Sequence, residues 1–453
     1  MMVRLFVCVF LCVFGWPVAA KELPRTSPEK TAMSAERLAR INAHMQAAVD
    51  DGTMVGGMAL IARDGKLIFE ETWGQADREN AIPMATDTIF RLYSMSKPIT
   101  SVALMTLYEE GRFELDDPIA KYIPQLADLK VALSTADAVS GVTSDGVMSR
   151  GSGNGDQSLV GQTRAPARQP TIHDLLRHTA GFTYGAFGNT EVDQMYRKAG
   201  YPQYNGNLEA FVTELGTFPL QYEPGTKWHY SVAVAVQGRL IEVLSGQALG
   251  EFMSDRLFKP LDMKDTGFRV PAADLPRFAQ MYAPEGVSPE GFGQRPTGKG
   301  LVVAAPYMSD GYINGRPLES GGIGLVGTAR DYLRFAQMLL NGGELDGQRI
   351  LSAKTVKYMT QNHLGELPMG LGRKGTGFGL GFAVVQDPAL AGTIGSAGEY
   401  SWGGAAGTTF WVDPAERLIG VFMVQSLPHL TRLKDQFKIL VYGAMTESYA
   451  PAR

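Results

Sequence analysis

The chain has 453 residues, of which 45% are hydrophobic and 19% are charged, a composition typical of a globular protein with a large buried core. The formal net charge of −4 at pH 7 argues against a nucleic-acid-binding surface and against a polybasic membrane-binding surface. The length allows two or three domains.

The N-terminus predicts a secretory signal peptide over residues 1–20. Arg4 precedes the apolar run Leu5 to Phe14, and Val18-Ala19-Ala20 supplies small residues for cleavage. The apolar run is too short to span a bilayer. We therefore expect a periplasmic or secreted protein without stable membrane insertion after cleavage. A buried N-terminal helix is the alternative interpretation.

The first predicted elements are a helix, a hairpin and a second helix. Apolar spacing predicts a helix over 31–49, and two apolar runs, 58–61 and 66–72, predict a hairpin with Arg63-Asp64-Gly65 at its turn. Proline is tolerated only in the first turn of a helix. Pro98 therefore places the start of the next helix within about one turn of Ser94.

The middle of the chain is predicted to be mainly helical. Helices are expected over 171–178, 232–245 and 328–340. Residues 133–169 are rich in Gly, Ser, Asp and Thr, which predicts a long flexible surface insertion. A flap over the functional site is the alternative for that insertion.

The last third alternates apolar strands with turns. Strands are predicted over 379–385, 408–412 and 418–424, and a helix over 431–446. Strands at both ends of the chain predict an α/β (α+β) fold with one antiparallel sheet flanked by helices. That sheet domain would comprise 21–113 and 305–453, and the inserted, mainly helical domain would comprise 114–304.

Ser94 and Lys97 are the candidate catalytic pair. A serine three residues before a lysine, at the start of a helix, places both side chains on one helix face. Free N–H groups at a helix N-terminus favour a developing oxyanion, and a desolvated lysine can act as a base. Ser27-Pro28-Glu29-Lys30 has the same spacing, but no apolar helix follows it. The pattern at Ser94 predicts an activated serine nucleophile.

The nucleophile needs a proton acceptor and an oxyanion hole. Tyr230, at a predicted turn-to-helix junction, would act with Lys97, and Tyr312 in a Tyr-x-Asn sequence competes with it. Glycines in Ser401-Trp402-Gly403-Gly404-Ala405 allow a close backbone approach; a simple bulge at a strand end is the alternative. The chain has no Gly-x-Ser-x-Gly sequence, and none of its six histidines lies in a nucleophile elbow: His44, His173, His178, His229, His363 and His429.

These segments together resemble the serine β-lactamase and penicillin-binding-protein superfamily, and most closely the family VIII carboxylesterases. The resemblance covers nearly the whole mature chain. The sequence around Tyr230 also resembles the tyrosine segment of that family, which favours Tyr230 over Tyr312. The matching segments are Ser94-Met95-Ser96-Lys97, Leu175-Leu176-Arg177-His178-Thr179-Ala180-Gly181, Tyr230-Ser231, Gly321-Gly322-Ile323-Gly324-Leu325 and Trp402-Gly403-Gly404.

The resemblance implies a role for each matching residue. Ser94 would be the acylated nucleophile, with Lys97 and Tyr230 as the proton-transfer pair. The N–H groups of Ser94 and Ala405 would form the oxyanion hole. The substrate-binding residues would be Trp402, Gly403 and Gly404. The resemblance leaves open which of Lys97 and Tyr230 takes the first proton.

One departure from class C β-lactamases bears on the substrate. Those enzymes carry Lys-Thr-Gly where this chain has Trp402-Gly403-Gly404. Loss of a charge-assisted contact costs about 1.5–3 kcal/mol, which corresponds to roughly ten- to hundredfold weaker handling of carboxylated substrates. A neutral ester suits the apolar indole better.

The sequence therefore predicts a serine hydrolase, a carboxylesterase that cleaves small acyl esters through an acyl-enzyme. The alternatives are a β-lactamase, D,D-peptidase or transesterase on the same scaffold, and a non-catalytic ligand-binding relative. No metal-ligand cluster or phosphate loop is visible in the sequence, so we expect no metal and no cofactor. Cys8 and Cys12 lie in the predicted signal peptide, so we expect neither a disulfide nor thiol catalysis in the mature chain.

Overall fold

The computed structural model describes residues 22–133, 162–200, 204–287, 300–315 and 318–450. The predicted signal peptide and most of the predicted insertion, residues 134–161, lie outside the described residues. At the two ends of that insertion, strands β5 (Val131–Ala132) and β6 (Thr163–Arg164) pair with each other. Within the described ranges, no helix has both the length and the apolar character needed to cross a bilayer.

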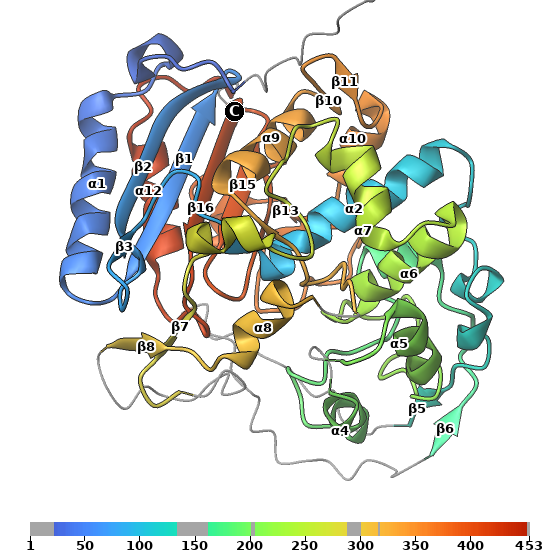
Figure 1. The fold of residues 1–453 in the computed structure, drawn as a ribbon. Coiled ribbons are helices and arrows are strands. Elements are labelled where there is room, and N and C mark those ends of the chain that lie inside the picture. Colours follow the sequence, from blue (N-terminus) through green and yellow to red (C-terminus); the bar gives the residue numbers. More distant parts are fainter. Residues whose placement is uncertain (1–21, 134–161, 201–203, 288–299, 316–317, 451–453) are drawn as a thin grey trace, which may run out of the picture.

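An eight-stranded antiparallel sheet is the central element of the fold (Figure 1). Its strand order is β12-β13-β14-β15-β16-β1-β2-β3, so three N-terminal strands lie beside five C-terminal ones. This order confirms the predicted sheet built from both chain ends. The strands are β1 Gly56–Arg63, β2 Lys66–Asp77, β3 Ile82–Pro83, β12 Thr376–Phe378, β13 Ala383–Val385, β14 Tyr400–Gly403, β15 Thr409–Asp413 and β16 Leu418–Val424.

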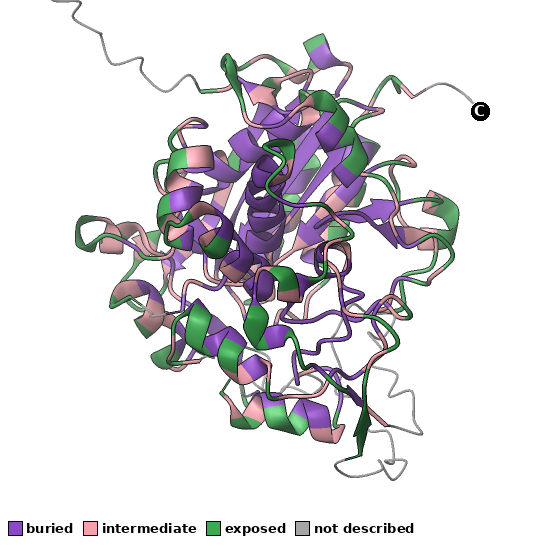
Figure 2. Cartoon of the chain, turned by 90° about the vertical axis from the view of Figure 1, so that its right-hand side faces the viewer, coloured by how far each residue is buried: buried purple, intermediate pink, exposed green. Residues whose placement is uncertain are grey.

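Helices cover both faces of the sheet. On β1, Ala59 and Ile61 share a core with α1 (Ala35–Asp50) and α12 (Leu433–Gly443). Met58 and Leu60 belong to the larger core, which includes α2 (Ser96–Glu109) and α9 (Ala329–Leu340). All eight residues of β1 are buried, as expected for a strand covered on both faces. Figure 2 shows the buried sheet, with the exposed positions on the peripheral elements.

The part of the fold outside the large sheet is mainly helical, as predicted. Helix α2 is buried continuously from Ser96 to Leu107 and packs against α6, so it joins the sheet to the helices around it. The proposed domain boundaries at 113/114 and 304/305 stay predictions. The other helices are α3 Ile172–Leu176, α4 Glu191–Lys198, α5 Leu208–Leu215, α6 Ala233–Ser245, α7 Leu249–Met253, α8 Tyr307–Ile313, α10 Ala353–Met359 and α11 Pro388–Ala391.

Besides β5 with β6, three further short strand pairs lie outside the large sheet in the described residues. The first of them leads into the candidate nucleophile, because its strand β4 ends three residues before Ser94. The pairs are β4 Phe90–Arg91 with β9 Val326–Gly327, β7 Tyr282–Pro284 with β8 Leu301–Val303, and β10 Glu344–Leu345 with β11 Gln348–Arg349.

Several predicted elements have different bounds in the structure, and two of these differences have a clear local cause. Residues 379–385 do not form one strand, because the N–H of Gly379 donates to the carbonyl of Phe382 (2.7 Å) in a tight turn. Gly381 in that turn has a φ of +98°, a conformation that favours glycine. The first helix begins at Ala35 instead of residue 31, because the Ser34 side chain accepts the N–H of Arg37 and caps it there.

The central strand β16 contains a glycine that the packing requires. A Cβ at Gly420 would lie 2.2 Å from the Trp411 ring. We expect Gly420→Ala to lower the free energy of unfolding by about 1–3 kcal/mol through overpacking, measured by urea denaturation. Gly443→Ala is the control, because a Cβ there meets nothing within 4 Å. Equal stability of the two variants would contradict this account of the sheet.

Candidate active site

Ser94 lies in a 3-10 turn, Tyr93–Met95, between β4 and α2. Pro98 is the third residue of α2, which confirms the predicted start of this helix. Two side chains fix the surrounding backbone: Ser96 Oγ accepts the N–H of Leu325 (3.1 Å), and Tyr332 Oη donates to the Met95 carbonyl (3.0 Å). These two bonds hold the turn in place, and Ser94 on it is half-buried.

The residue before the nucleophile has an unfavourable backbone conformation. Tyr93 has a φ of +46°, which for a bulky residue costs about 1–3 kcal/mol. Its ring packs edge-on against Tyr312, with 6.4 Å between the ring centroids. Such strain persists only where neighbouring structure imposes it, and it directs the backbone into Ser94.

Lys97 lies beside Ser94, as the sequence predicts. Its Nζ is 3.2 Å from Ser94 Oγ and donates to the carbonyl of Gly322 at 2.7 Å. The side chain is buried, with 1% of the residue exposed. Burial lowers the pKa of Lys97 well below its ordinary value, because desolvation disfavours the charged amine. A neutral amine at this distance can accept a proton from the serine hydroxyl.

Tyr230 lies just before α6, and its side chain reaches the same place. Lys97 Nζ is 4.7 Å from the centroid of the Tyr230 ring. The Trp402 indole N–H donates to Tyr230 Oη at 3.3 Å. Both aromatic residues are buried. The structure thus brings Ser94, Lys97, Tyr230 and Trp402 together, although more than 300 residues separate the first from the last.

The contact between Trp402 and Tyr230 adds to what the sequence predicts. Sequence reasoning treats Trp402 as an apolar wall for the substrate. In the structure its ring packs against Phe378 (5.3 Å between centroids) and Tyr230 (5.4 Å), and its N–H engages the phenol oxygen. This donor stabilises negative charge on that oxygen without adding a cation.

The turn after β14 brings the backbone next to Ala405 close to Leu92, which directly follows strand β4. The N–H of Gly404 donates to the Thr408 carbonyl (2.7 Å), and a Cβ at Gly404 would lie 2.5 Å from the Leu92 carbonyl oxygen. Only glycine permits this approach. Ala405 and Tyr93 pack against the same apolar cluster. The oxyanion-hole roles of Ser94 and Ala405 stay predictions.

The competing tyrosine and the histidines have other partners. Tyr312 Oη donates to the carbonyl of Ile323 (3.0 Å). His178 is buried 5.0 Å from the Tyr230 ring, with Nδ1 3.4 Å from Ser231 Oγ. Burial lowers the pKa of His178 well below its ordinary value. Within the described chain, the hydrogen bond at Ser94 Oγ involves Lys97 and no histidine.

Sequence reasoning missed several residues at this site. The Gly322 carbonyl holds Lys97, and the sequence shows this glycine only as part of a matching segment. Tyr184 and Phe187 pack against the Tyr230 ring at 5.2 and 5.7 Å between centroids. Their sequence, Phe182 to Phe187, is rich in aromatic residues, but no spacing rule connects it to Tyr230. Within the described ranges, no cluster of three metal-ligating side chains occurs.

Comparison with known proteins agrees with this geometry. The chain matches the family named Beta-lactamase over residues 41–442. The chain belongs to the beta-lactamase family. Protein Rv1367c of Mycobacterium tuberculosis is 32% identical over 394 residues, covering 84% of this chain and 88% of that protein. Esterase EstB of Burkholderia gladioli is 30% identical over 390 residues, with the same coverage.

A solved structure has the same fold. EstCE1, described as a hydrolase with promiscuous acyltransferase activity, superposes with a TM-score of 0.70 at 29% identity and covers 90% of this chain and 99% of EstCE1. The resemblance inferred from the motifs is therefore confirmed at the level of family and fold. The chain therefore belongs to a family of hydrolases.

Because the Lys97 amine is buried, we expect its removal to make the folded protein more stable. At pH values below 10.5, the ordinary lysine pKa, the Lys97 amine is protonated in the unfolded chain. In the folded chain the amine stays neutral until the pH falls below its lowered pKa. Stability therefore rises with pH in that window. We expect Lys97→Met to raise the free energy of unfolding at pH 7 by about 0.5–2 kcal/mol and to weaken this pH dependence.

Urea denaturation at several pH values measures this effect. Lys66→Met is the matched control, since Lys66 is exposed at the start of β2, and a change within about 0.5 kcal/mol is expected there. A loss of stability in Lys97→Met at pH 7 would show that the amine is charged in the folded protein.

Proposed function

We propose that this chain is a serine carboxylesterase that cleaves small, neutral acyl esters through a covalent acyl-enzyme on Ser94. The single observation that carries the proposal is the 3.2 Å approach of the buried Lys97 amine to Ser94 Oγ, because it supplies both a nucleophile and a base that is uncharged. The esterase relatives support this choice of reaction.

Acylation begins when Ser94 Oγ attacks the ester carbonyl carbon. Its proton passes directly to the neutral Lys97 Nζ, or to Tyr230 Oη after that phenol has given its own proton to Lys97, whose amine lies 4.7 Å from the centroid of the Tyr230 ring. The carbonyl oxygen gains negative charge and is stabilised by the N–H groups of Ser94 and Ala405. The C–O bond to the alcohol then breaks, the alcohol oxygen takes the proton, and an ester of Ser94 remains.

Deacylation repeats these steps with water. Water gives a proton to the same base and attacks the acyl carbon, and Ser94 Oγ leaves and is protonated again. The hydrogen bond from the Trp402 N–H to Tyr230 Oη (3.3 Å) supports a role for this oxygen in both transfers. The short distance between the Lys97 amine and the Tyr230 ring, 4.7 Å to the centroid, supports the assignment of these two residues as the proton-transfer pair.

The site favours a neutral substrate. Trp402 stands where class C enzymes carry a lysine, so the motif offers a neutral N–H donor in place of a cation. Aromatic rings surround Tyr230 in the described chain, namely His178, Tyr184, Phe187, Trp228 and Trp402. A carboxylated substrate would lose solvation in such surroundings without gaining an ion pair.

Acyl transfer to an alcohol is a second candidate function. An acyl-enzyme can be intercepted by any nucleophile that the site admits, and the ring cluster around Tyr230 is a better environment for an alcohol than for water. The promiscuous acyltransferase activity in the description of EstCE1 supports this candidate.

We also propose, from the N-terminal sequence, that the protein acts outside the cytoplasm.

Intact-protein mass spectrometry tests the acyl-enzyme. After mixing with a short-chain aryl ester, we expect wild type to gain the acyl mass on the peptide containing Ser94. Ser94→Ala should gain none and should lose at least about 10³-fold in hydrolysis rate. Ser27→Ala, in the other Ser-x-x-Lys sequence, is the matched control and should keep full activity.

Three further arms of this experiment separate the alternatives. A cephalosporin turned over as efficiently as the ester would contradict the esterase assignment in favour of a β-lactamase. Addition of a primary alcohol that yields the new ester in place of free acid would assign acyl transfer. An unmodified wild-type protein with no turnover would leave only the non-catalytic alternative.

Replacement of one tryptophan tests its N–H donor. Trp402→Phe keeps an aromatic ring between Phe378 and Tyr230 but removes the bond to Tyr230 Oη. We expect kcat for the aryl ester to fall by about tenfold, the equivalent of one hydrogen bond. Trp411→Phe is the control, because that indole N–H is buried without a hydrogen-bond partner in the described chain. An unchanged kcat in Trp402→Phe would exclude a role for the donor.

A further inference from the structure

Arg91 is a buried cation three residues before the nucleophile. Only 1% of the residue is exposed, and its guanidinium makes contacts with three different segments. It donates to the carbonyl of Ala279 (2.6 Å), to Gln425 Oε1 (3.2 Å) and to Ser309 Oγ (2.5 Å), and it lies 3.8 Å from the centroid of the Phe278 ring. The catalytic steps proposed above do not use this residue.

Gln425 binds the backbone of Arg91 as well as its side chain. Its Oε1 accepts the N–H of Arg91 (3.0 Å), and its Nε2 donates to the Arg91 carbonyl (3.2 Å). Strand β4 pairs with β9 outside the large sheet. Because Gln425 directly follows β16, its side chain joins strand β4 to the end of the large sheet.

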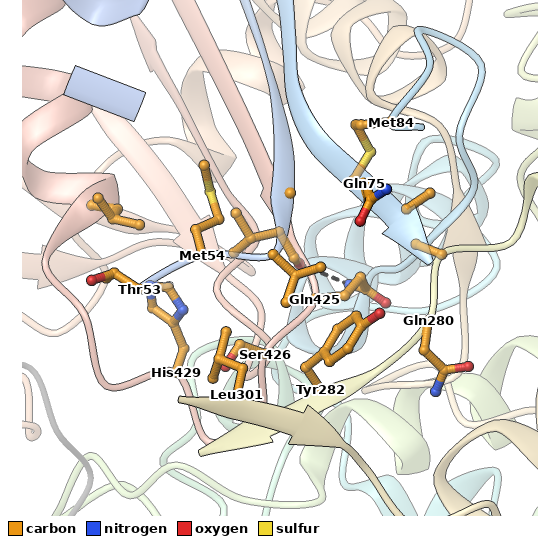
Figure 3. Close-up of a pocket in the computed structure, with 16 residues that line it drawn as sticks. Thr53, Met54, Gln75, Met84, Gln280, Tyr282, Leu301, Gln425, Ser426 and His429 are labelled. Atoms are coloured by element: carbon orange, nitrogen blue, oxygen red, sulfur yellow. Dashed lines mark hydrogen bonds between the residues drawn. The ribbon is translucent and has the colours of Figure 1, made fainter. Parts of the chain in front are cut away.

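The neighbourhood of Gln425 includes a pocket that is distinct from the site. Gln425 lines it together with Ser426 and Tyr282 (Figure 3), and Ser94, Lys97 and Tyr230 are not among the residues that line it. Ser426 N–H donates to the Ala406 carbonyl at 3.0 Å, so the backbone next to Gln425 also supports the turn that carries Ala405. Arg91 is thus linked to both backbone segments of the predicted oxyanion hole.

Ser309 connects Arg91 to helix α8, which packs against Tyr93. Met308 of α8 lies in the apolar cluster against which Tyr93 and Ala405 pack, and Tyr312 of the same helix meets the Tyr93 ring edge-on. The left-handed conformation of Tyr93 needs this support from its surroundings. A displacement of α8 would let Tyr93 relax and would turn the N–H of Ser94 away.

We propose that Arg91 is a positioning residue for the oxyanion hole. It holds α8 against Tyr93 and Ala405 and holds β4 against the sheet, and so fixes the orientation of the Ser94 and Ala405 N–H groups. This inference rests on the proposed function, since it concerns the charge that develops during acyl transfer. It differs from a role in packing alone because it acts on the transition state more than on substrate binding.

Kinetics of four proteins test the proposal: wild type, Arg91→Met, Ser309→Ala and Arg334→Met. Arg334 is the control, a buried arginine whose partners Leu261 and Asp346 take no part in the site. Arg91→Met should lower kcat for the aryl ester by about 10–100-fold with KM changed less than about threefold. Ser309→Ala, which loses only the link to α8, should lower kcat by about two- to tenfold.

The rates are expressed per active site, titrated with an aryl phosphonate, so that unfolded protein does not contribute. A boronic acid supplies the readout that packing alone would not move, because its adduct with Ser94 places an oxygen in the oxyanion hole. Its affinity should fall in Arg91→Met by about the same factor as kcat/KM. Arg334→Met should melt at a lower temperature and keep both values within about twofold of wild type.

The outcomes separate this inference from the proposed function. If wild type forms no adduct with the phosphonate or the boronic acid, the proposed function fails and the inference fails with it. If wild type reacts and Arg91→Met matches it in kcat and boronate affinity per active site, Arg91 has no positioning role. If Arg334→Met falls as far as Arg91→Met, the effect is general loss of packing and the inference is overturned.

Discussion

Lys97 is held where almost no water reaches its amine, and the rest of the site depends on this burial. Its hydrogen-bond partners in the described chain are the neutral Gly322 carbonyl and Ser94 Oγ, so the uncharged amine is the stable form. The faces of Tyr184 and Tyr230 lie 5.2 and 4.7 Å from the same nitrogen. Aromatic faces attract a cation, so in the proposed mechanism they would stabilise the ammonium during the short time that it carries the serine proton. The same surroundings therefore favour a neutral base at rest and limit the cost of its protonation during catalysis.

Two close backbone approaches allow distant parts of the chain to meet at the start of α2. A Cβ at Gly321 would lie 2.7 Å from the Thr100 side chain, and one at Gly404 would lie 2.5 Å from the Leu92 carbonyl oxygen. Both glycines are thus required by lack of space, and both carry neighbours that the mechanism uses: Gly322 holds the amine and Ala405 presents an N–H. The strained φ of Tyr93 belongs to the same arrangement, since it turns the chain from β4 into the nucleophile between these two segments.

The parts of the site that are local in sequence could be predicted, and the parts set by tertiary packing could not. Ser94 and Lys97 are neighbours through helix geometry alone, and Pro98 locates the helix start. The hairpin of β1 and β2, with its glycine turn after Arg63, likewise follows from local rules. The bond from the Trp402 N–H to Tyr230 depends on where two side chains 172 residues apart point, and no periodicity contains that information. The turn at Gly379–Phe382 was missed for a related reason, because an apolar run reads as a strand until a positive φ at Gly381 breaks it. The resemblance to a known family favoured Tyr230 over Tyr312 and implied a substrate-binding role for Trp402, but it did not predict the contact between Tyr230 and Trp402.

The means by which Lys97 is tuned also bear on the choice of substrate. A second lysine in the position of Trp402 would disfavour protonation of Lys97 by like-charge repulsion and would bind a carboxylate at the same time. In this chain burial alone lowers the pKa of Lys97, so the base does not need a neighbouring cation. Once burial supplies that effect, position 402 can carry an indole, which donates to Tyr230 and leaves the substrate side apolar. Charges that act at a distance are screened by salt, whereas a base tuned by packing is not. Its reactivity depends instead on the ring cluster that excludes water, and a substrate that brings its own charge into that cluster works against the property that makes the lysine a base.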